Sequence, residues 1–211
     1  MGIELNEDQL FTAMDMEHWF HSGTKQTYEI SGAAGTGKTT MVLYLIEQLG
    51  LSLDDVLFMA YMGKAATQLA RHGLPAKTIH SSIYDYEVVP VRDESGHRIF
   101  LSDGRVKCKG QFVLKDHMKK RIKLIVVDEC GMVPVDIAKD ILSYDLPVIA
   151  LGDLNQLPPV FGNPYFLQKP DSILRKIMRQ SEGNPIVWLS QQILQGNYLK
   201  PGVYGKSAVI H

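Results

Sequence analysis

A glycine-rich octapeptide, Gly32-Ala33-Ala34-Gly35-Thr36-Gly37-Lys38-Thr39, has the residue types and spacing that most clearly predict chemistry. It matches the pattern G-x-x-x-x-G-K-[ST], in which glycines let backbone N–H groups turn inward around a phosphate. Lys38 would reach the β and γ phosphates, and the Thr39 hydroxyl would ligate Mg²⁺. Because a predicted strand precedes the loop and a predicted helix follows it, a helix N-terminus would face the anion. The predicted ATP contacts are Gly32, Ala33, Ala34, Gly35, Thr36, Gly37, Lys38, Thr39 and Thr40.

An apolar run that ends in two acids is the second such signal. Residues 124–127 are Leu-Ile-Val-Val, and Asp128 and Glu129 follow them directly. On its own this pattern is most often a strand end with solvated carboxylates. Downstream of a phosphate loop it favours a nucleotide hydrolase, with Asp128 holding the metal and Glu129 orienting or deprotonating the attacking water. The second acid points to hydrolysis rather than to phosphoryl transfer onto a small acceptor.

A third segment, Gly-Asp-Leu-Asn-Gln-Leu-Pro-Pro-Val at residues 152–160, follows another apolar run. Ligands of α/β sheets bind at loops that leave the carboxyl ends of strands, and this segment is such a loop. Gln156 in it would sense a γ phosphate by hydrogen bonding. The spacing alone leaves open a proline-stiffened turn with no role in binding.

Strands that alternate with helices make up most of the remaining sequence. Continuous apolar runs predict strands at residues 56–61, 124–127 and 147–151, and Thr, Tyr and Ile predict a short strand at residues 26–30. Apolar residues at helical spacing predict helices at residues 6–20, 39–49, 64–71, 135–142, 172–178 and 185–194. This order predicts an α/β fold in which helices cover both faces of a parallel sheet.

Residues 84–114 break this rhythm. Their alternating pattern, with turn signals at Asp93-Glu94-Ser95-Gly96 and Asp103-Gly104, predicts a small antiparallel insertion of two or three short strands. Directly after it, Lys115, His117, Lys119, Lys120, Arg121 and Lys123 form a basic cluster. Such a cluster can steer phosphates, although a basic run is more often a solvated face.

The composition excludes several classes of protein. Lys and Arg number 22 and Asp and Glu 23, so any contact with nucleic acid must come from local patches. Two cysteines, Cys108 and Cys130, are too few for a disulfide scaffold or a four-cysteine zinc site. No apolar run approaches the roughly 18 residues of a membrane span. We therefore expect a cytoplasmic protein of a bacterial or phage-infected cell, without a membrane partner.

Taken in order, the phosphate loop, the Asp128-Glu129 strand end and the segment 152–160 resemble the first RecA-like domain of superfamily I DNA helicases. The resemblance is strongest to the RecD-like and Dda-like group, which moves 5′ to 3′ and includes exodeoxyribonuclease V alpha-like members. It covers nearly the whole chain. It implies a RecA-like P-loop NTPase fold that couples ATP hydrolysis to translocation on single-stranded DNA and to unwinding at duplex junctions, in repair or replication. Subunits of a helicase–nuclease are candidate partners.

The resemblance also assigns roles to individual residues. Gln9, in Leu-Asn-Glu-Asp-Gln at residues 5–9, matches the glutamine that hydrogen-bonds adenine, although a capping role at the start of the first helix is the alternative. Arg179 matches an arginine that approaches the γ phosphate; its alternative role is to bind carbonyls at a helix end. The residues that match DNA-contacting motifs are Gly63, Lys64, Thr78, His80 and Ser81.

Two departures and one insertion qualify the resemblance. Tyr61-Met62 stands where relatives usually carry a polar or proline-containing pair, and Cys130-Gly131 replaces the common Ala-Ser after the acids. Residues 84–114 lie where relatives place a small subdomain with a strand-separating hairpin. Ile99 and Phe100 would stack on a base there or, more simply, pack within the hairpin.

The resemblance further implies a division of the chain. Residues 1–83 and 115–195 would form the first RecA-like domain, 84–114 the insertion, and 196–211 the start of a linker to a second RecA-like domain. This fragment would bind nucleotide, hydrolyse it slowly and not unwind DNA, since an arginine supplied from the far side is worth about 10³ to 10⁵ in rate. The alternatives are a P-loop kinase, an ATP-sensing module without helicase activity, and an RNA-directed helicase.

Overall fold

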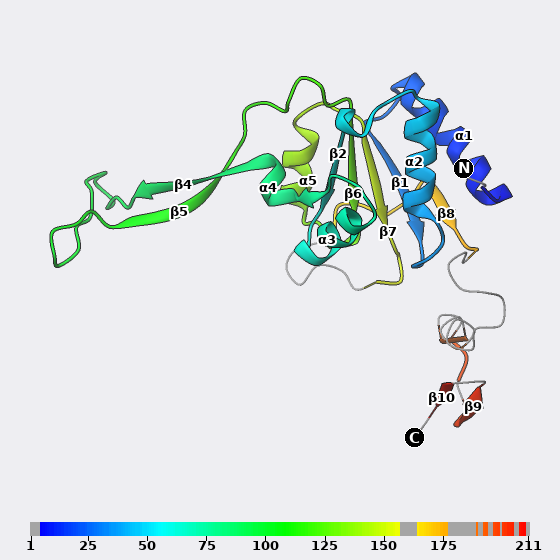
Figure 1. The fold of residues 1–211 in the computed structure, drawn as a ribbon. Helices are drawn as coiled ribbons and strands as arrows, with labels where there is room; N and C mark the ends of the chain where they lie inside the picture. Colours follow the sequence, from blue (N-terminus) through cyan, green and yellow to red (C-terminus); the bar gives the residue numbers. More distant parts are fainter. Residues whose placement is uncertain are drawn as a thin grey trace.

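Apolar runs form the centre of a parallel sheet, as the sequence predicts (Figure 1). The computed structural model describes residues 5–156, 164–176, 189, 192–193, 196–198, 200–204 and 207–209. The strands are β1 (Thr27–Gly32), β2 (Val56–Ala60), β3 (Lys77–Thr78), β6 (Leu124–Asp128), β7 (Val148–Gly152) and β8 (Ser172–Leu174). They form a 6-stranded sheet in the order β3-β2-β6-β7-β1-β8, and every pairing is parallel.

The strand register brings the predicted chemistry to one edge of the sheet. Ala60 pairs with Asp128, and Ser31 pairs with Gly152. The carboxyl ends of β1, β6 and β7 therefore lie at the same edge. The phosphate loop, the Asp-Glu pair and the loop after Gly152 leave the sheet there, as expected for ligand-binding loops of open α/β sheets.

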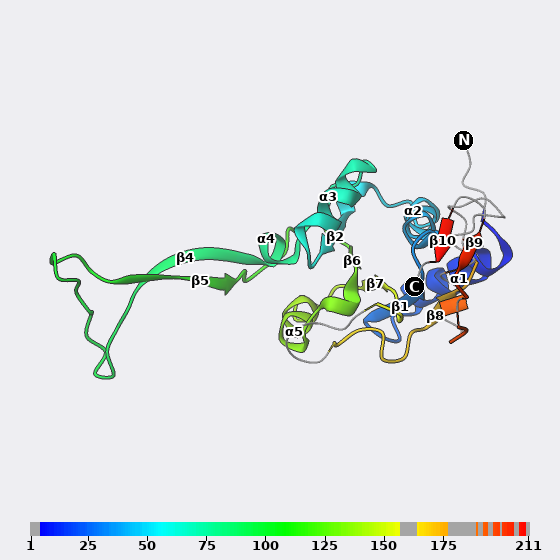
Figure 2. The same ribbon diagram turned by 90° about the horizontal axis from the view of Figure 1, so that it is seen from below.

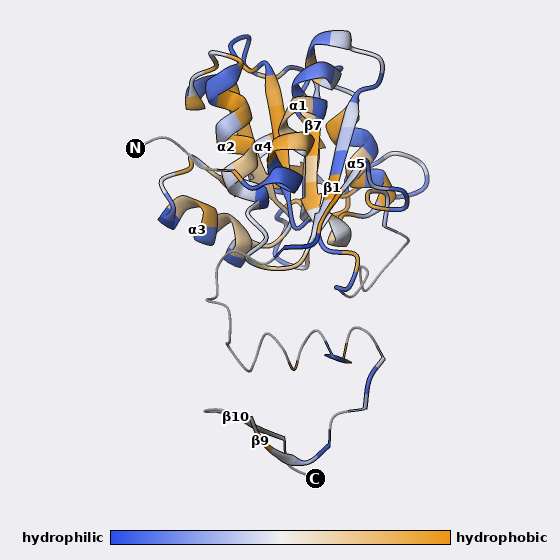
Figure 3. Ribbon diagram, turned by 90° about the vertical axis from the view of Figure 1, so that its right-hand side faces the viewer, coloured by the Kyte–Doolittle hydropathy of each residue, from blue (hydrophilic) through white to orange (hydrophobic). Residues whose placement is uncertain are grey.

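Helices cover both faces of the sheet. The strands carry apolar side chains on both faces, because successive side chains point to opposite sides, and both faces must therefore be shielded from water. One face packs against α1 (Glu7–Ser22), α2 (Lys38–Gln48) and α3 (Gly63–Arg71), with a core that includes Trp19, Phe58 and Leu69. The other packs against α4 (Ile79–Ile83), η2 (Cys130–Met132) and α5 (Val135–Leu142). Figure 3 shows the hydrophobic colouring concentrated in the strands and in the packed sides of helices. The expected fold class is thus confirmed.

A long hairpin projects from the body of the sheet (Figures 1 and 2). Its strands, β4 (Tyr84–Pro90) and β5 (Cys108–Leu114), are antiparallel and pair along their whole length, from Tyr84 with Leu114 to Pro90 with Cys108. The distal part adds bridges between Arg92 and Arg98 and between Phe100 and Val106. The antiparallel insertion predicted at residues 84–114 is therefore present.

The predicted helix at residues 172–178 is wrong over its described part. Residues 172–174 form β8, which pairs with β1 through Ile30–Ser172 and Gly32–Leu174. A segment of three residues is too short for its hydrophobic pattern to distinguish a strand from a helix. Its strand conformation depends on pairing with the open edge of β1, which the local sequence does not reveal. Residues 177–178 lie outside the described residues, as does most of the helix predicted at 185–194, of which Leu189, Gln192 and Ile193 are helical.

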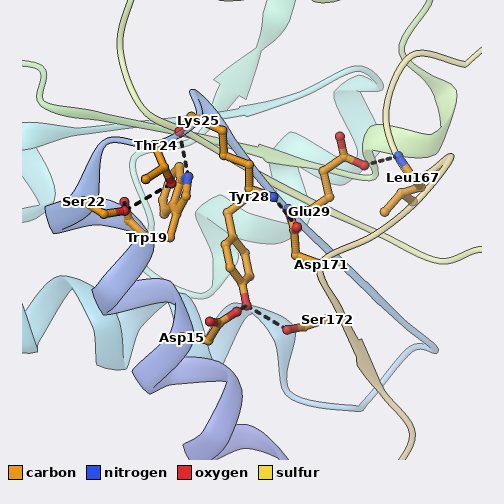
Figure 4. A network of polar contacts seen from close by, with 10 residues as sticks. All are labelled: Asp15, Trp19, Ser22, Thr24, Lys25, Tyr28, Glu29, Leu167, Asp171 and Ser172. Carbon is orange, nitrogen blue, oxygen red and sulfur yellow. Dashed lines mark hydrogen bonds and ion pairs between the residues drawn. The ribbon is translucent and has the colours of Figure 1, made fainter.

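A polar network fixes β8 and the segment before it (Figure 4). The Tyr28 hydroxyl donates to Asp15 Oδ2 of α1 at 2.5 Å and lies 2.8 Å from the Ser172 hydroxyl. Asp171 Oδ2 accepts from the Glu29 N–H at 2.8 Å, and Lys25 pairs with the same Asp171. Burial, followed by the hydrogen bond to Asp15, raises the pKa of Tyr28 above its usual range. The network ties α1, β1 and β8 into one unit.

The remaining described elements are short. η1 (Leu53–Asp55) precedes β2, and β9 (Gly202–Tyr204) pairs with β10 (Ser207–Val209) near the C-terminus. No helix in the described part of the chain is both long enough and apolar enough to cross a membrane.

Candidate nucleotide and nucleic-acid sites

The phosphate loop connects the end of β1 to the start of α2, as its sequence predicts. Gly37 caps α2 with a φ of 85°, a left-handed conformation that favours glycine. A Cβ at Gly37 would lie 2.2 Å from Gln9 Nε2, and a Cβ at Gly32 would lie 2.6 Å from Thr36 Oγ1. Close packing therefore favours glycine at both positions, and the left-handed backbone conformation adds to this at Gly37.

Lys38 is held over the loop by the backbone. Its Nζ donates to the carbonyl oxygens of Gly32 and Ala33, the latter at 3.3 Å. Thr36 is buried and donates through Oγ1 to Ala33 O at 2.9 Å, which closes the turn from within. The lysine ammonium thus lies at the loop where a phosphate would be cradled.

Gln9 links the first helix to this loop. Its Nε2 donates to Thr36 O at 2.9 Å, and its Oε1 accepts from the Asn6 N–H at 3.0 Å. Asn6 Oδ1 accepts in turn from the Gln9 N–H at 3.0 Å, which completes a capping box at the start of α1. Gln9 therefore caps α1, and its additional bond to the loop is a contact that the sequence did not predict.

The Asp-Glu pair lies at the carboxyl end of β6. Glu129 has a φ of 51°, uncommon for a residue with a side chain, and begins the η2 turn. Burial, and then the charge of Glu129, raise the pKa of Asp128 above its ordinary value, while the charge of Lys38 opposes this. A cation would relieve the repulsion between these two carboxylates.

One cavity of about 350 Å³ brings these elements together. It contains predicted ATP, metal and catalytic residues from the loop, from α2 and from β6. It also contains three residues of α3 and His72, which caps the C-terminal end of α3, and the sequence analysis assigned none of the four to the nucleotide. The lining residues are Ala34, Gly35, Gly37, Lys38, Thr39, Thr40, Ala65, Gln68, Leu69, His72, Asp128 and Glu129.

The donor chemistry of the cavity fits Mg²⁺. A hydroxyl from Thr39 and carboxylates from Asp128 and Glu129 are the hard oxygen ligands that this ion prefers. Mg²⁺ usually takes only one or two protein carboxylates together with phosphate and water. Thr39 and Asp128 line the same cavity, so both could share an ion with a bound phosphate.

Of the two remaining predicted catalytic residues, Gln156 is not among the residues that line this cavity, and Arg179 is not among the residues that the structure describes. Gln156 is exposed on a turn after β7, where its N–H donates to Asp153 O at 3.1 Å, and it does not line the cavity. The turn is nonetheless tied to β1, because the Leu154 N–H donates to Ser31 Oγ at 3.1 Å. Arg179 lies outside the described residues, and only Arg175 and Lys176 of its predicted motif are described after β8.

The candidate DNA contacts gather at a second location, beside the hairpin. Gly63 and Lys64 begin α3 and are exposed. Thr78 ends β3 and caps α4, accepting from the Ser81 N–H at 3.2 Å. A Cβ at Gly63 would lie 3.9 Å from Thr78 Cγ2. Two motifs that are separate in sequence are therefore neighbours at the end of β2 and β3.

His80 belongs to an aromatic cluster at the base of the hairpin. Its ring centroid lies 5.3 Å from that of Phe112, 5.5 Å from that of Tyr84 and 6.1 Å from that of Tyr61. Tyr86 continues the cluster, 5.5 Å from Phe112. The sequence analysis did not predict these contacts, because they join residues of four elements.

The pairing register places aromatic and apolar residues on one face of the hairpin. Tyr84 pairs with Leu114, and Tyr86 pairs with Phe112. Because side chains alternate along a strand, these four residues and Val88 point to the same face of the hairpin. We call this set the aromatic face. Asp85 and Glu87 occupy alternate positions and point to the other face. Tyr86 and Phe112 are 65% and 58% exposed, so these rings are open to a flat ligand.

Three of the six residues of the basic cluster lie beside acids. Arg121 pairs with Asp54 at 3.3 Å, and Lys123 pairs with Asp55 at 3.5 Å. Lys115 lies 3.8 Å from Asp85 and donates to the carbonyls of Ser81 and Ser82. These contacts favour the solvated-face interpretation over a phosphate-binding patch.

The chain matches the AAA domain family AAA_19 over residues 20–162 and belongs to it. Its fold matches the RecA-like fold of solved Pif1 helicase structures. It aligns with the crystal structure of Pif1 from Bacteroides sp. in complex with ADP-AlF4, with a TM-score of 0.54 and 22% identity, covering 90% of this chain and 46% of that one. It aligns with Pif1 helicase from Candida albicans with a TM-score of 0.56 and 19% identity, covering 93% of this chain and 45% of that one.

Curated relatives are much longer than this chain. It is 31% identical over 187 residues to the uncharacterized protein MJ1519 of Methanocaldococcus jannaschii, covering 78% of this chain and 15% of that protein. It is 27% identical over 175 residues to the DNA replication ATP-dependent helicase/nuclease dna2 of Schizosaccharomyces pombe, covering 75% of this chain and 12% of that one. The chain thus spans under a sixth of the length of either relative.

Proposed function

We propose that the chain is the ATP-hydrolysing domain of a helicase that moves along single-stranded DNA. The observation that carries this proposal is the cavity lined together by Lys38 and Thr39 of the phosphate-binding segment and by Asp128 and Glu129 at the end of β6. A phosphate loop facing two carboxylates supplies both the positive charge for a triphosphate and a base for the attacking water.

Each residue of the cavity has a distinct role in this proposal. The backbone N–H groups of residues 34–37 and Lys38 bind the β and γ phosphates. Thr39 and Asp128 hold Mg²⁺, which supplies charge neutralisation when bound. Glu129 orients the attacking water and accepts its proton, because it lies at the cavity wall next to Asp128. Gln9 recognises adenine from α1, and Gln156 and Arg179 sense the γ phosphate.

Single-stranded nucleic acid is the proposed partner of the second site. Thr78 and Ser81 present hydroxyls and Lys64 a positive charge, groups that bind phosphate oxygens. His80 joins these residues to the aromatic face, on which unpaired bases would stack. The carboxylates of Asp85 and Glu87 point to the opposite face, which keeps negative charge away from a polyanion.

The proposal includes the division of the chain and the direction of movement. Residues 1–83 and 115–195 act as the first RecA-like domain, residues 84–114 as its hairpin insertion, and residues 196–211 lead towards a second domain that completes the ATP site. The 5′ to 3′ polarity of the RecD-like and Dda-like group is part of the same proposal. Similarity to Pif1 and dna2 supports a helicase, and a helicase–nuclease partner remains a candidate.

Turnover of ATP with and without single-stranded DNA tests this function. We expect slow hydrolysis that oligo-dT stimulates more than oligo-U does, and that is lost in Glu129→Gln while ATP still binds. Stronger stimulation by oligo-U would indicate an RNA-directed helicase. A phosphorylated small product would indicate a kinase. Tight ATP binding with no turnover under any condition would indicate an ATP-sensing module.

A further inference from the structure

The helix α3 faces the nucleotide cavity with polar side chains that the proposed mechanism does not use. Ala65, Gln68, Leu69 and His72 all line the cavity. Their positions differ by three, four and seven residues, so they form one stripe along the helix. Gln68 and His72 are the polar members of this stripe, and each carries hydrogen-bond donors.

Packing fixes the position of this stripe. Leu69 is 4% exposed and belongs to the core cluster that also contains Met41 and Val42 of α2. Ala66, one residue from the stripe, is also buried. Since α2 begins at the phosphate loop, this shared core packs α3 against the helix that carries the loop. Gln68 and the C-cap residue His72 are therefore presented to the cavity by a packed helix and its end.

The side chains of Gln68 and His72 have hydrogen-bond donors that the described part of the protein does not use. Neither makes a hydrogen bond, ion pair or ring contact through its side chain within the part of the chain that the structure describes. Both are exposed, unlike the buried Leu69 beside them. A ligand that entered the cavity would meet an amide and an imidazole without displacing any contact of the protein.

The other residues of the same cavity identify the part of the nucleotide that Gln68 and His72 would meet. Thr39, Asp128 and Glu129 line the same cavity and are the groups proposed for the metal and the attacking water. Gln9, the residue proposed for adenine, does not line it. The stripe on α3 thus faces the γ-phosphate end of the nucleotide, the group whose loss distinguishes ADP from ATP.

We propose that Gln68 and His72 hydrogen-bond the γ phosphate or its ordered water and so make α3 sensitive to the nucleotide state. This inference rests on the proposed function. The N-terminal end of the same helix carries Gly63, beside Thr78. A shift of α3 on loss of the γ phosphate would therefore act directly on the proposed strand contacts.

Binding of two nucleotides to purified variants of the chain tests the proposal. The probes are ADP and a non-hydrolysable ATP analogue with a β,γ-imido bridge, each with Mg²⁺, measured by isothermal titration calorimetry. In Gln68→Ala and in His72→Ala we expect binding of the analogue to weaken about 3- to 10-fold, the effect of losing one hydrogen bond, and binding of ADP to stay within about twofold. Thr67→Ala, on the same helix but outside the cavity, should bind both like wild type.

The outcomes separate this inference from the function on which it rests. If wild type binds both nucleotides and both variants bind the analogue unchanged, Gln68 and His72 have no role in binding. If ADP and the analogue weaken equally while the unfolding midpoint stays constant, the contact is not to the γ phosphate and the proposal is wrong. If wild type binds neither nucleotide, the proposed ATPase function itself fails.

Discussion

Gln9 of α1 donates a hydrogen bond of 2.9 Å to the carbonyl oxygen of Thr36 in the phosphate loop. This bond is buried and joins residues 27 positions apart in the chain. The same side chain completes the capping box with Asn6. One residue therefore stabilises the start of the first helix and the shape of the loop that would bind phosphate.

Substitution at Gln9 separates these two roles. Gln9→Ala removes both, and we expect a loss of about 1–2 kcal/mol in stability with several-fold weaker nucleotide binding. Gln9→Glu keeps an acceptor for the Asn6 N–H but cannot donate to Thr36 O, so it should retain the helix cap and still bind nucleotide weakly. Chemical denaturation and calorimetry measure the two effects. Wild-type nucleotide affinity in Gln9→Glu would show that the bond to Thr36 is unimportant.

The glycine that follows Thr36 allows a matched comparison. Gly37 and Gly96 have nearly equal φ values of 85° and 83°, but a Cβ at Gly96 meets nothing within 4 Å. Gly96→Ala should cost only the left-handed backbone penalty of about 1–2 kcal/mol. Gly37→Ala should cost more, because its Cβ would displace the Gln9 amide. Equal losses of unfolding free energy in the two variants would contradict the close packing described for the loop.

A pH dependence is expected at Glu29. Burial raises the pKa of this carboxyl above its ordinary value. The Leu167 N–H donates a hydrogen bond of 2.7 Å to the carboxyl and lowers its pKa, but by less than burial raises it. A raised folded-state pKa favours the protonated form, so the contribution of Glu29 to stability is greatest below the ordinary carboxyl pKa and is lost as pH rises through the folded value. Glu29→Gln keeps the acceptor and the shape.

Thermal unfolding from about pH 4 to pH 8 measures this effect. We expect Glu29→Gln to gain stability relative to wild type as pH rises, and the difference to shrink on acidification. If the stability of wild type instead increased relative to that of Glu29→Gln as pH rises, the folded state would favour the ionised carboxylate.

The aromatic face of the hairpin predicts a contribution to DNA binding. Phe112→Ala removes an exposed ring that contacts His80 and Tyr86, and we expect oligo-dT binding to weaken by about 1–3 kcal/mol. Gln111→Ala, on the opposite face of the same strand, should leave binding unchanged. Fluorescence anisotropy at fixed salt measures both. Equal affinities of the two variants would exclude stacking on this face.

The sequence predicted those parts of the molecule in which local pattern and tertiary structure agree. Buried strands such as β6 and β7 have continuous apolar runs. The capping residue Asn6 marks the start of α1, and Gly23 marks its end. The phosphate loop was identified because its chemistry requires a contiguous segment. The residues of the loop and of the Asp-Glu pair meet in space because parallel strands end at one edge.

Contacts between distant elements were not predictable in this way. β8 is a strand because its backbone pairs with the open edge of β1 and the Ser172 hydroxyl contacts that of Tyr28. Its three residues are too few to show a periodicity that distinguishes a strand from a helix. The cluster around His80 joins α4, β4, β5 and Tyr61, which directly follows β2, and its spacing in sequence has no regularity. Gln68 and His72 showed helical spacing, but only the fold reveals which side of α3 meets the cavity.

The most direct test of the account is the affinity of the chain for a Mg²⁺-bound, non-hydrolysable ATP analogue, measured by calorimetry in wild type and in Lys38→Ala. The lysine ammonium is the only side-chain cation predicted to meet the phosphates within the described loop, so its removal should weaken binding at least about 10-fold, the value of a charge-assisted hydrogen bond. The unfolding midpoint should change little. Unchanged affinity in Lys38→Ala would mean that the triphosphate does not bind at this loop.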